Sequence, residues 1–352
     1  MKSPKFYLAK LIAAILHAVK KAPPSKPVER VLLVNTFGLG DVLLSTTCLP
    51  VLRKRFPNAH IAFWVTPTAA EALRGNPYLN EIVSRDFSFL RPARDFDLTV
   101  LLTYHPFQTL AVRGIPYQVG YLHGKRVQSN GFPVEQREWS GQHLVHLAGE
   151  VALALGCEAP ENQPLIFPDE RDRERARLLS PEGAFLAVNL QTKIASKSWP
   201  LDRMKQIVSW SPIPVALIGG EADRDVAAEV QEENPSVINL TGLLSVTETA
   251  ALLGLCSVFL TADSGPMHLG FAAQAPTVAL FGYTDPTQIF LPAPERILLH
   301  HPRPCAPHFK VGVKDAHYEE CPTRECMTAI GVEEVKSAIL ELLERSAGRH
   351  SN

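Results

Sequence analysis

The sequence has few cysteines, almost no net charge and no long apolar run. Six cysteines in 352 residues are too sparse for a disulfide scaffold and fit a cytoplasmic protein. The formal net charge of −1 argues against nucleic-acid binding, which requires a basic surface. No run of about 18 consecutive apolar residues occurs, so we expect no membrane-spanning helix. The hydrophobic fraction of 46% instead predicts a folded protein with a substantial core.

The basic N-terminus needs a separate interpretation. At helical spacing Lys10, His17 and Lys21 fall on one face, and leucines and isoleucines gather on the other. Lys10 interrupts the apolar run and no small-residue cleavage site follows, which argues against a signal peptide. Residues 1–21 therefore predict an amphipathic helix that either packs on the protein or lies on the anionic inner face of the cytoplasmic membrane, and residues 22–27 predict a stiff linker. If the helix binds lipid, deleting both segments should release the protein from anionic vesicles in a co-sedimentation assay, since each basic residue contributes about 1 kcal/mol.

The remaining sequence predicts an α/β architecture. Apolar, β-branched runs alternate with helical segments, a pattern typical of parallel βαβ units. The pattern restarts after a polar stretch at 167–183. We therefore expect two Rossmann-like domains with parallel sheets, residues 28–170 and 171–330, followed by a C-terminal helix and tail at 331–352. Ligands of such sheets bind beyond the carboxyl ends of the strands, and the cleft between the two domains is the expected site. The strands are expected at 28–35, 60–66, 97–104, 184–190, 214–220, 257–262 and 276–282.

Polar residues gather where the strand expected at 257–262 ends and a helix begins. Asp263 closes the strand, and Ser264 is a favoured N-cap residue. The free N–H groups of a helix start form an anion site, Gly265 would let a phosphate approach the backbone, and His268 lies one turn further on. A capped turn without any ligand would show the same residues.

Two further clusters follow neighbouring predicted strands. Thr192 and Lys197 come after the strand at 184–190, and a lysine there offers a compact positive charge to a phosphate. Asp223 comes after the strand at 214–220 and can accept hydrogen bonds from ribose hydroxyls. All three clusters fall on one edge of one predicted sheet. Together they predict a nucleoside-diphosphate site.

The first domain carries a glycine turn with an aspartate. Gly38 and Gly40 follow a strand, but the third glycine of a dinucleotide fingerprint would fall at Leu43, and no acidic residue ends the second strand. This argues against an NAD-dependent oxidoreductase. Asp41 stands at a helix start, where the dipole favours its ionised form. It is either a carboxylate that serves the helix or a general base.

The chain resembles glycosyltransferase family 9, the lipopolysaccharide heptosyltransferases. The matching stretches are VERVLLVNTFGLGDVLLSTTCLPVLRKRFPNAHIAFWV, SKSWPLDRM, the run from LTGLLS to FGYTDP, and CMTAIGVEEV. The most specific is DSGPMHL followed by FGYTDP. The resemblance implies the GT-B fold and the transfer of a heptose from an ADP-activated donor to a lipid-anchored saccharide, with inversion and with no essential metal or other cofactor. By the same resemblance Asp41 corresponds to the catalytic base, and the donor-binding positions are Thr192, Lys197, Asp223, Asp263, Ser264, Gly265 and His268.

Two departures from the family pattern leave the donor sugar and the acceptor open. The segment 190–193 is poorer in small residues than is usual in the family, and the basic N-terminal extension is not part of the common core. A non-catalytic protein that binds nucleotide sugars is the main alternative function.

Two sets of residues resemble metal ligands. Asp95 and Asp97 form a D-x-D pair, but they precede a strand, so Asp97 is expected to cap the strand entry rather than hold Mg²⁺. Cys305, Cys321 and Cys326 lie close in sequence to His308 and His317. Thiolates with an imidazole could hold zinc or iron, and free cytoplasmic thiols are the alternative. Cys48, Cys157 and Cys256 stand in apolar surroundings and are expected to be core thiols.

Overall fold

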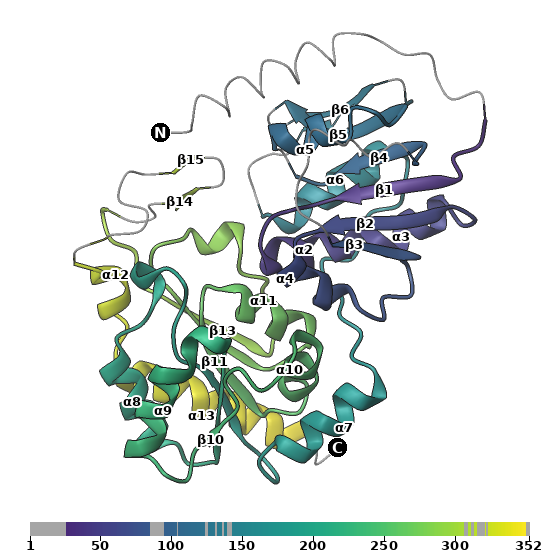
Figure 1. Cartoon of the computed structure of the whole chain (residues 1–352). Helices are drawn as coiled ribbons and strands as arrows, with labels where there is room; N and C mark the ends of the chain where they lie inside the picture. The colour runs from purple at the N-terminus through teal and green to yellow at the C-terminus, as the bar shows by residue number, and fades with distance from the viewer. Residues whose placement is uncertain are drawn as a thin grey trace. The chain divides into compact units, whose positions relative to one another are not determined.

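The computed structural model divides the chain into two units, residues 1–165 and 166–352, which Figure 1 shows in purple to teal and in teal to yellow. The division falls a few residues before the boundary expected at 170/171. The amphipathic helix expected at 1–21 lies outside the described residues, as do His308 and His317. The structure describes residues 26–84, 95–103, 105–123, 126–130, 132–135, 137–138, 143–305, 309–310, 313–314, 321 and 323–349. Within these ranges no helix is both long and apolar enough to cross a membrane.

The first unit is built on a seven-stranded sheet with the order β3-β2-β1-β4-β5-β6-β7. Strands β1 to β5 run parallel, but β6 and β7 are antiparallel additions at one edge. The parallel sheet that the sequence predicted is confirmed for β1 to β5, and the antiparallel strands β6 and β7 were not predicted. A connection as short as that from β5 to β6 allows only a hairpin, because a parallel crossover needs a dozen or more residues. The strands are β1 (Arg30–Val34), β2 (His60–Val65), β3 (Glu81–Ser84), β4 (Leu98–Leu101), β5 (Tyr117–His123), β6 (Arg126–Asn130) and β7 (Arg137–Glu138).

Helices connect the parallel strands of this unit. The four residues Val31 to Val34 of β1 are fully buried, as expected for a strand covered on both faces. The helices are α2 (Leu39–Ser45), α3 (Leu49–Arg55), α4 (Pro67–Ala70), α5 (Pro106–Ala111) and α6 (Val145–Ala154), with short 3₁₀ turns η1 (Thr46–Cys48) and η2 (Glu71–Leu73).

The second unit has a six-stranded, wholly parallel sheet with the order β10-β9-β8-β11-β12-β13. The strands are β8 (Leu186–Asn189), β9 (Val215–Ile218), β10 (Ile238–Asn239), β11 (Val258–Ala262), β12 (Thr277–Phe281) and β13 (Arg296–His300). Of these, β10 and β13 were not predicted. A separate two-stranded ribbon consists of β14 (Phe309–Lys310) and β15 (Val313–Lys314).

Two helices of the second unit correct the interpretation of the sequence. The polar stretch at 167–183 contains helix α7 (Glu170–Leu179), which starts with a capping box between Asp169 and Asp172. The expected C-terminal helix is present as α13 (Val332–Arg349). It is part of the second unit, because Val335, Ile339 and neighbouring side chains are buried in the core of that unit. The other helices are α8 (Leu201–Trp210), α9 (Arg224–Glu233), α10 (Val246–Leu253), α11 (Gly265–Ala272) and α12 (Glu325–Thr328), with the 3₁₀ turns η3 (Ala195–Lys197), η4 (Glu221–Asp223) and η5 (Pro286–Gln288).

Candidate functional site

The carboxyl edge of the second sheet collects the polar residues that the sequence singled out. Because β8, β9, β11 and β12 are parallel neighbours, the loops that follow them meet at one edge. The loop after β8 carries Thr192 and Lys197, the loop after β9 carries Asp223, and β11 runs directly into Asp263. The loop after β12 adds Thr284.

Lys197 and Asp263 form a buried ion pair at this edge. The Nζ atom of Lys197 lies 2.6 Å from Oδ2 of Asp263, and the two side chains are only 13% and 7% exposed. The Oγ1 hydroxyl of Thr284 donates a hydrogen bond of 2.5 Å to the same carboxylate oxygen. The ring of Tyr283 lies over the ammonium, with Nζ 5.8 Å from its centroid. The sequence placed Lys197 and Asp263 on one edge but did not predict that they pair with each other.

The surroundings of Asp263 keep its carboxylate ionised. Burial alone would raise the pKa of Asp263, but the Lys197 ammonium, the Thr284 hydroxyl and the nearby His268 imidazole together hold that pKa below its ordinary value. The site therefore contains a fixed ammonium and a fixed carboxylate, shielded from water. Such a preorganised pair can bind and orient a charged ligand without rearranging.

The loop after β8 is held in shape by its own side chains. Thr192 donates from Oγ1 to the carbonyl of Ile194 at 2.7 Å, and its backbone N–H donates to Oγ of Ser198 at 2.9 Å. Thr192 thus shapes the loop that carries Lys197.

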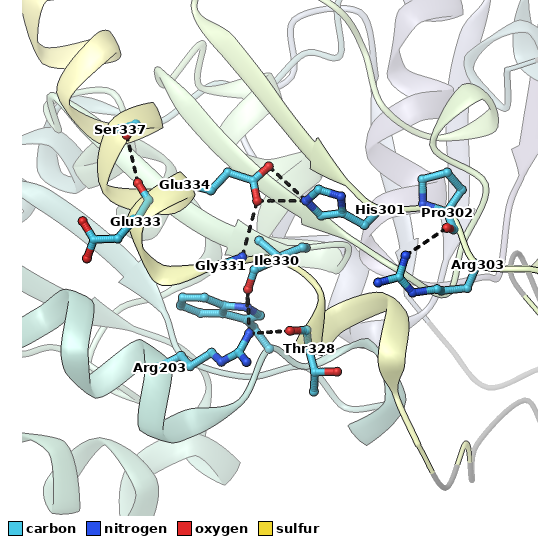
Figure 2. Close-up of polar contacts among 11 residues, drawn as sticks. Arg203, His301, Pro302, Arg303, Thr328, Ile330, Gly331, Glu333, Glu334 and Ser337 are labelled. Atoms are coloured by element: carbon cyan, nitrogen blue, oxygen red, sulfur yellow. Dashed lines mark hydrogen bonds and ion pairs between the residues drawn. The ribbon is translucent and has the colours of Figure 1, made fainter.

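Trp199 and Arg203 anchor the loop after β8, and the helix α8 that follows it, to the segment between α12 and α13. The buried Trp199 donates from Nε1 to the carbonyl of Ile330 at 3.1 Å. Figure 2 shows Arg203 of α8 reaching the same turn, where its Nη1 atom donates to the carbonyls of Thr328 and Ile330 at 2.6 and 2.7 Å. The stretches SKSWPLDRM and CMTAIGVEEV, which lie far apart in the sequence, are therefore in direct contact.

The first turn of α13 completes this junction. In Figure 2 the carboxylate of Glu334 faces His301, with Nε2 of His301 2.9 Å from Oε2. The same oxygen accepts a hydrogen bond of 3.4 Å from the N–H of Gly331. The segment between α12 and α13 is thereby tied to the end of β13 as well as to α8.

Asp223 links the loops that follow β8 and β9 at the carboxyl edge of the second sheet. Its Oδ2 accepts a hydrogen bond of 2.8 Å from the N–H of Gly220, and its Oδ1 accepts one of 3.0 Å from Nε2 of Gln191. A carboxylate has about four lone-pair sites, so both oxygens retain the capacity to accept another hydrogen bond. Gln191 was not singled out from the sequence.

Helix α11 begins as predicted, but Ser264 does not cap it through its side chain. Ser264 occupies the N-cap position with extended backbone, and its Oγ donates to the carbonyl of Ala262 at 3.2 Å. The predicted N-cap position is confirmed, although the Ser264 hydroxyl bonds to the end of the preceding strand and not to the helix. Gly265 is the first residue of the helix. His268 is buried one turn into it, with its ring 6.1 Å from that of Phe271.

In the first unit, Asp41 stands in the first turn of α2. The N-cap position belongs to Gly38, and Asp41 is the third helical residue. Its Oδ2 atom folds back to within 3.7 Å of the place where a Cβ on Gly38 would stand. The fully buried Asn35 shapes this turn by donating from Nδ2 to the carbonyl of Asp41 at 3.1 Å and to Oγ of Ser45 at 2.8 Å. The sequence did not single out Asn35, which shapes this turn through these hydrogen bonds.

Asp97 has a structural role at the start of β1. Its Oδ2 atom accepts hydrogen bonds from the backbone N–H groups of Glu29 and Arg30, at 2.9 and 2.8 Å. The prediction that Asp97 caps the entry of β4 is therefore wrong, because its carboxylate instead secures the start of the neighbouring strand β1.

The cysteines are free thiols in different environments. Cys48 and Cys256 are buried, as expected, whereas Cys157 is half-buried and Cys305 is exposed. Cys326 packs against Gly282, where an added Cβ would meet its sulfur at 2.8 Å. Across the described ranges, no three His, Cys, Asp or Glu side chains are grouped as metal ligands.

The sequence is similar to a glycosyltransferase family model and to known heptosyltransferases. A family model described as glycosyltransferase family 9 (heptosyltransferase) matches residues 95–318. Lipopolysaccharide heptosyltransferase 3 of Escherichia coli (strain K12) is 23% identical over 346 residues, which cover 88% of this chain and 96% of that protein.

Two solved structures share the fold. The glycosyl transferase family 9 structure from Veillonella parvula DSM 2008 has a TM-score of 0.72 at 22% identity and covers 90% of this chain and 98% of its own. E. coli heptosyltransferase WaaC with ADP-2-deoxy-2-fluoro heptose has a TM-score of 0.59 at 16% identity, over 89% and 99% of the two chains. The predicted class of two GT-B-type α/β domains is confirmed.

Proposed function

Because this chain belongs to glycosyltransferase family 9, the heptosyltransferases, we propose that it transfers a heptose from an ADP-activated donor to a lipid-anchored saccharide of the lipopolysaccharide core, with inversion at the anomeric carbon. The chain is a heptosyltransferase-family glycosyltransferase of lipopolysaccharide biosynthesis. The donor is inferred from the relatives, of which WaaC is described with ADP-2-deoxy-2-fluoro heptose.

The buried pair of Lys197 and Asp263 carries the proposal for the donor site. An ammonium has three N–H donors, and only one is needed for the 2.6 Å contact with Asp263. The others are suited to the oxygens of a diphosphate. The start of α11, at Ser264 and Gly265, adds backbone N–H groups and the positive end of the helix dipole. His268 and Thr192 support this surface, and Asp223 is suited to accept hydrogen bonds from ribose hydroxyls.

The same groups would assist departure of the leaving group. During transfer the bond between the anomeric carbon and the diphosphate oxygen breaks, and the departing ADP gains negative charge. A fixed ammonium and a helix N-terminus at this edge would stabilise that developing charge without rearranging. This is the electrostatic contribution that we assign to Lys197 and α11.

Asp41 is the proposed general base. As the acceptor hydroxyl forms its bond to the anomeric carbon, its proton passes to the carboxylate of Asp41. Attack opposite the leaving diphosphate inverts the configuration in one step. The start of α2 favours the ionised carboxylate that a base requires, and no covalent sugar–enzyme intermediate is involved.

A panel of nucleotides in a thermal-shift assay tests the donor site. Saturating ADP should raise the Tm, because a ligand that binds only the folded protein stabilises it by about 2.7 kcal/mol at a hundred times its Kd. GDP, UDP and NAD serve as matched controls. Stabilisation by NAD without ADP would favour an oxidoreductase and contradict the proposal. ADP binding without any sugar transfer would favour a non-catalytic nucleotide-sugar-binding protein.

A further inference from the structure

The FGYTDP segment after β12 supplies a hydroxyl to the buried ion pair. Thr284 is 1% exposed, and its Oγ1 donates to Oδ2 of Asp263 at 2.5 Å. Lys197 contacts that same oxygen atom at 2.6 Å. One carboxylate oxygen therefore receives two donors, one charged and one neutral, from loops that follow different strands.

The geometry of Thr284 limits the movement of both charged groups. A carboxylate that only paired with the flexible Lys197 side chain could rotate about its Cβ–Cγ bond. The β-branched Thr284 has restricted χ1 freedom, so its hydroxyl is a fixed donor that selects one orientation of Asp263. The adjacent Tyr283, also 1% exposed, covers the Lys197 ammonium from the same loop. The loop thus constrains the carboxylate and the ammonium together.

We propose that Thr284 is a positioning residue of the donor site, which holds Asp263 ionised and oriented so that Lys197 presents its ammonium to the diphosphate. This inference rests on the proposed function. Thr284 acts through Asp263 and need not touch the donor. A threonine hydroxyl bonded to a charged group contributes more than one bonded to a neutral group.

The charge on Asp263 gives this role a pH signature. The groups that face Asp263 are Lys197, Thr284 and His268, and against the effect of burial they hold its pKa below the ordinary value. A group whose pKa is lowered by folding adds stability above its unfolded pKa and loses that stability as pH falls through its folded pKa. Without the Thr284 hydroxyl, the pKa of Asp263 in the folded protein rises. Asp263 therefore becomes protonated at a higher pH in the variant than in the wild type.

The test compares Thr284→Val, Thr284→Ser and Thr277→Val. Thr277 is a matched control in the same unit, since it is fully buried and its Oγ1 donates to the neutral carbonyl of Ala275 at 2.7 Å. At about pH 8, Thr284→Val should lower the Tm by about 3–10 °C and weaken ADP binding by about threefold to tenfold. Thr284→Ser should weaken ADP binding less than Thr284→Val does, because it keeps the hydroxyl donor but loses the β-branch that restricts it.

The decisive measurement is how the difference in Tm between each variant and the wild type changes with pH. The Tm gap between wild type and Thr284→Val should stay constant from about pH 8 to about pH 5 and narrow below about pH 4, where Asp263 becomes protonated, whereas the gap for Thr277→Val should stay constant throughout.

The outcomes separate this inference from the proposed function. A gap for Thr284→Val that is independent of pH, or ADP affinity equal to that of the wild type, would overturn the positioning role. Wild-type protein that fails to bind ADP would overturn the proposed function and with it any role in donor binding. The pH-dependent gap would in that case still show that Thr284 holds Asp263.

Discussion

Asp41→Asn should slow sugar transfer by about 10²–10⁴-fold, the usual contribution of a general base. The substitution keeps the shape of the side chain and removes the proton acceptor. ADP affinity should hardly change, because the proposed donor residues all belong to the second unit. The measurement is the transfer rate at saturating donor and acceptor, together with the Kd for ADP of the same preparation.

A role in helix stability alone would give a different result. Asp41 lies in the first turn of α2, where a carboxylate contributes about 0.3–1 kcal/mol through the helix dipole. If that were its function, Asp41→Asn would lower the Tm slightly and leave transfer near the parent rate. Asp202→Asn is the matched control, since Asp202 occupies the first turn of α8, and it should retain full activity. Equal activity of both variants would remove Asp41 from the chemistry.

Lys197→Met should weaken ADP binding and slow transfer, each by about tenfold to a hundredfold, because a hydrogen bond from a charged donor contributes about 1.5–3 kcal/mol. The variant should also be less stable, because Asp263 would remain buried without its cation. Breaking a buried pair on one side costs about 3–5 kcal/mol. Loss of ADP binding in this single variant could therefore come from the lost ammonium or from the lower stability of the fold.

The double variant Lys197→Met/Asp263→Asn separates them. It removes both charges, so most of the stability should return while ADP binding stays weak. Lys205→Met is the control, since Lys205 pairs with Glu229 in the same unit, at 2.6 Å, and it should bind ADP normally. A double variant that is stable and binds ADP like the wild type would show that Lys197 only neutralises Asp263. Calorimetric titration with ADP and a thermal melt provide both readouts.

The sequence predicted the central strands well and the sheet edges poorly. The strands β1, β2, β8, β9, β11 and β12 are nearly continuous apolar runs with buried residues, and burial on both faces leaves such a run few alternatives. Strands β5 (YQVGYLH) and β6 (RVQSN), which lie toward one end of the first sheet, are rich in polar residues, and β5 contains a glycine, so neither carries a clear period. Their positions depend on pairing with neighbouring strands, which the residues of one strand alone do not encode.

The site was predicted in outline. The order of strands and helices put Lys197 and Asp263 on one edge, because parallel strands end together. Their direct contact spans 66 residues of sequence and depends on side-chain conformations, which no local pattern specifies. Thr284 was missed for the same reason, although its FGYTDP segment was recognised as specific to the family. Ser264 occupies the N-cap position that its residue type predicted, but its hydroxyl donates to the carbonyl of Ala262 and does not accept from the helix.

The central claim is that this chain is an inverting transferase for an ADP-activated heptose, and the most direct test follows the sugar itself. The wild-type protein is incubated with ADP-heptose and a lipopolysaccharide-core acceptor, and the new linkage is examined by NMR while released ADP is measured. The account predicts one ADP for each sugar transferred and a product whose anomeric configuration is opposite to that of the donor. A product with retained configuration, or no transfer although ADP binds, would contradict it.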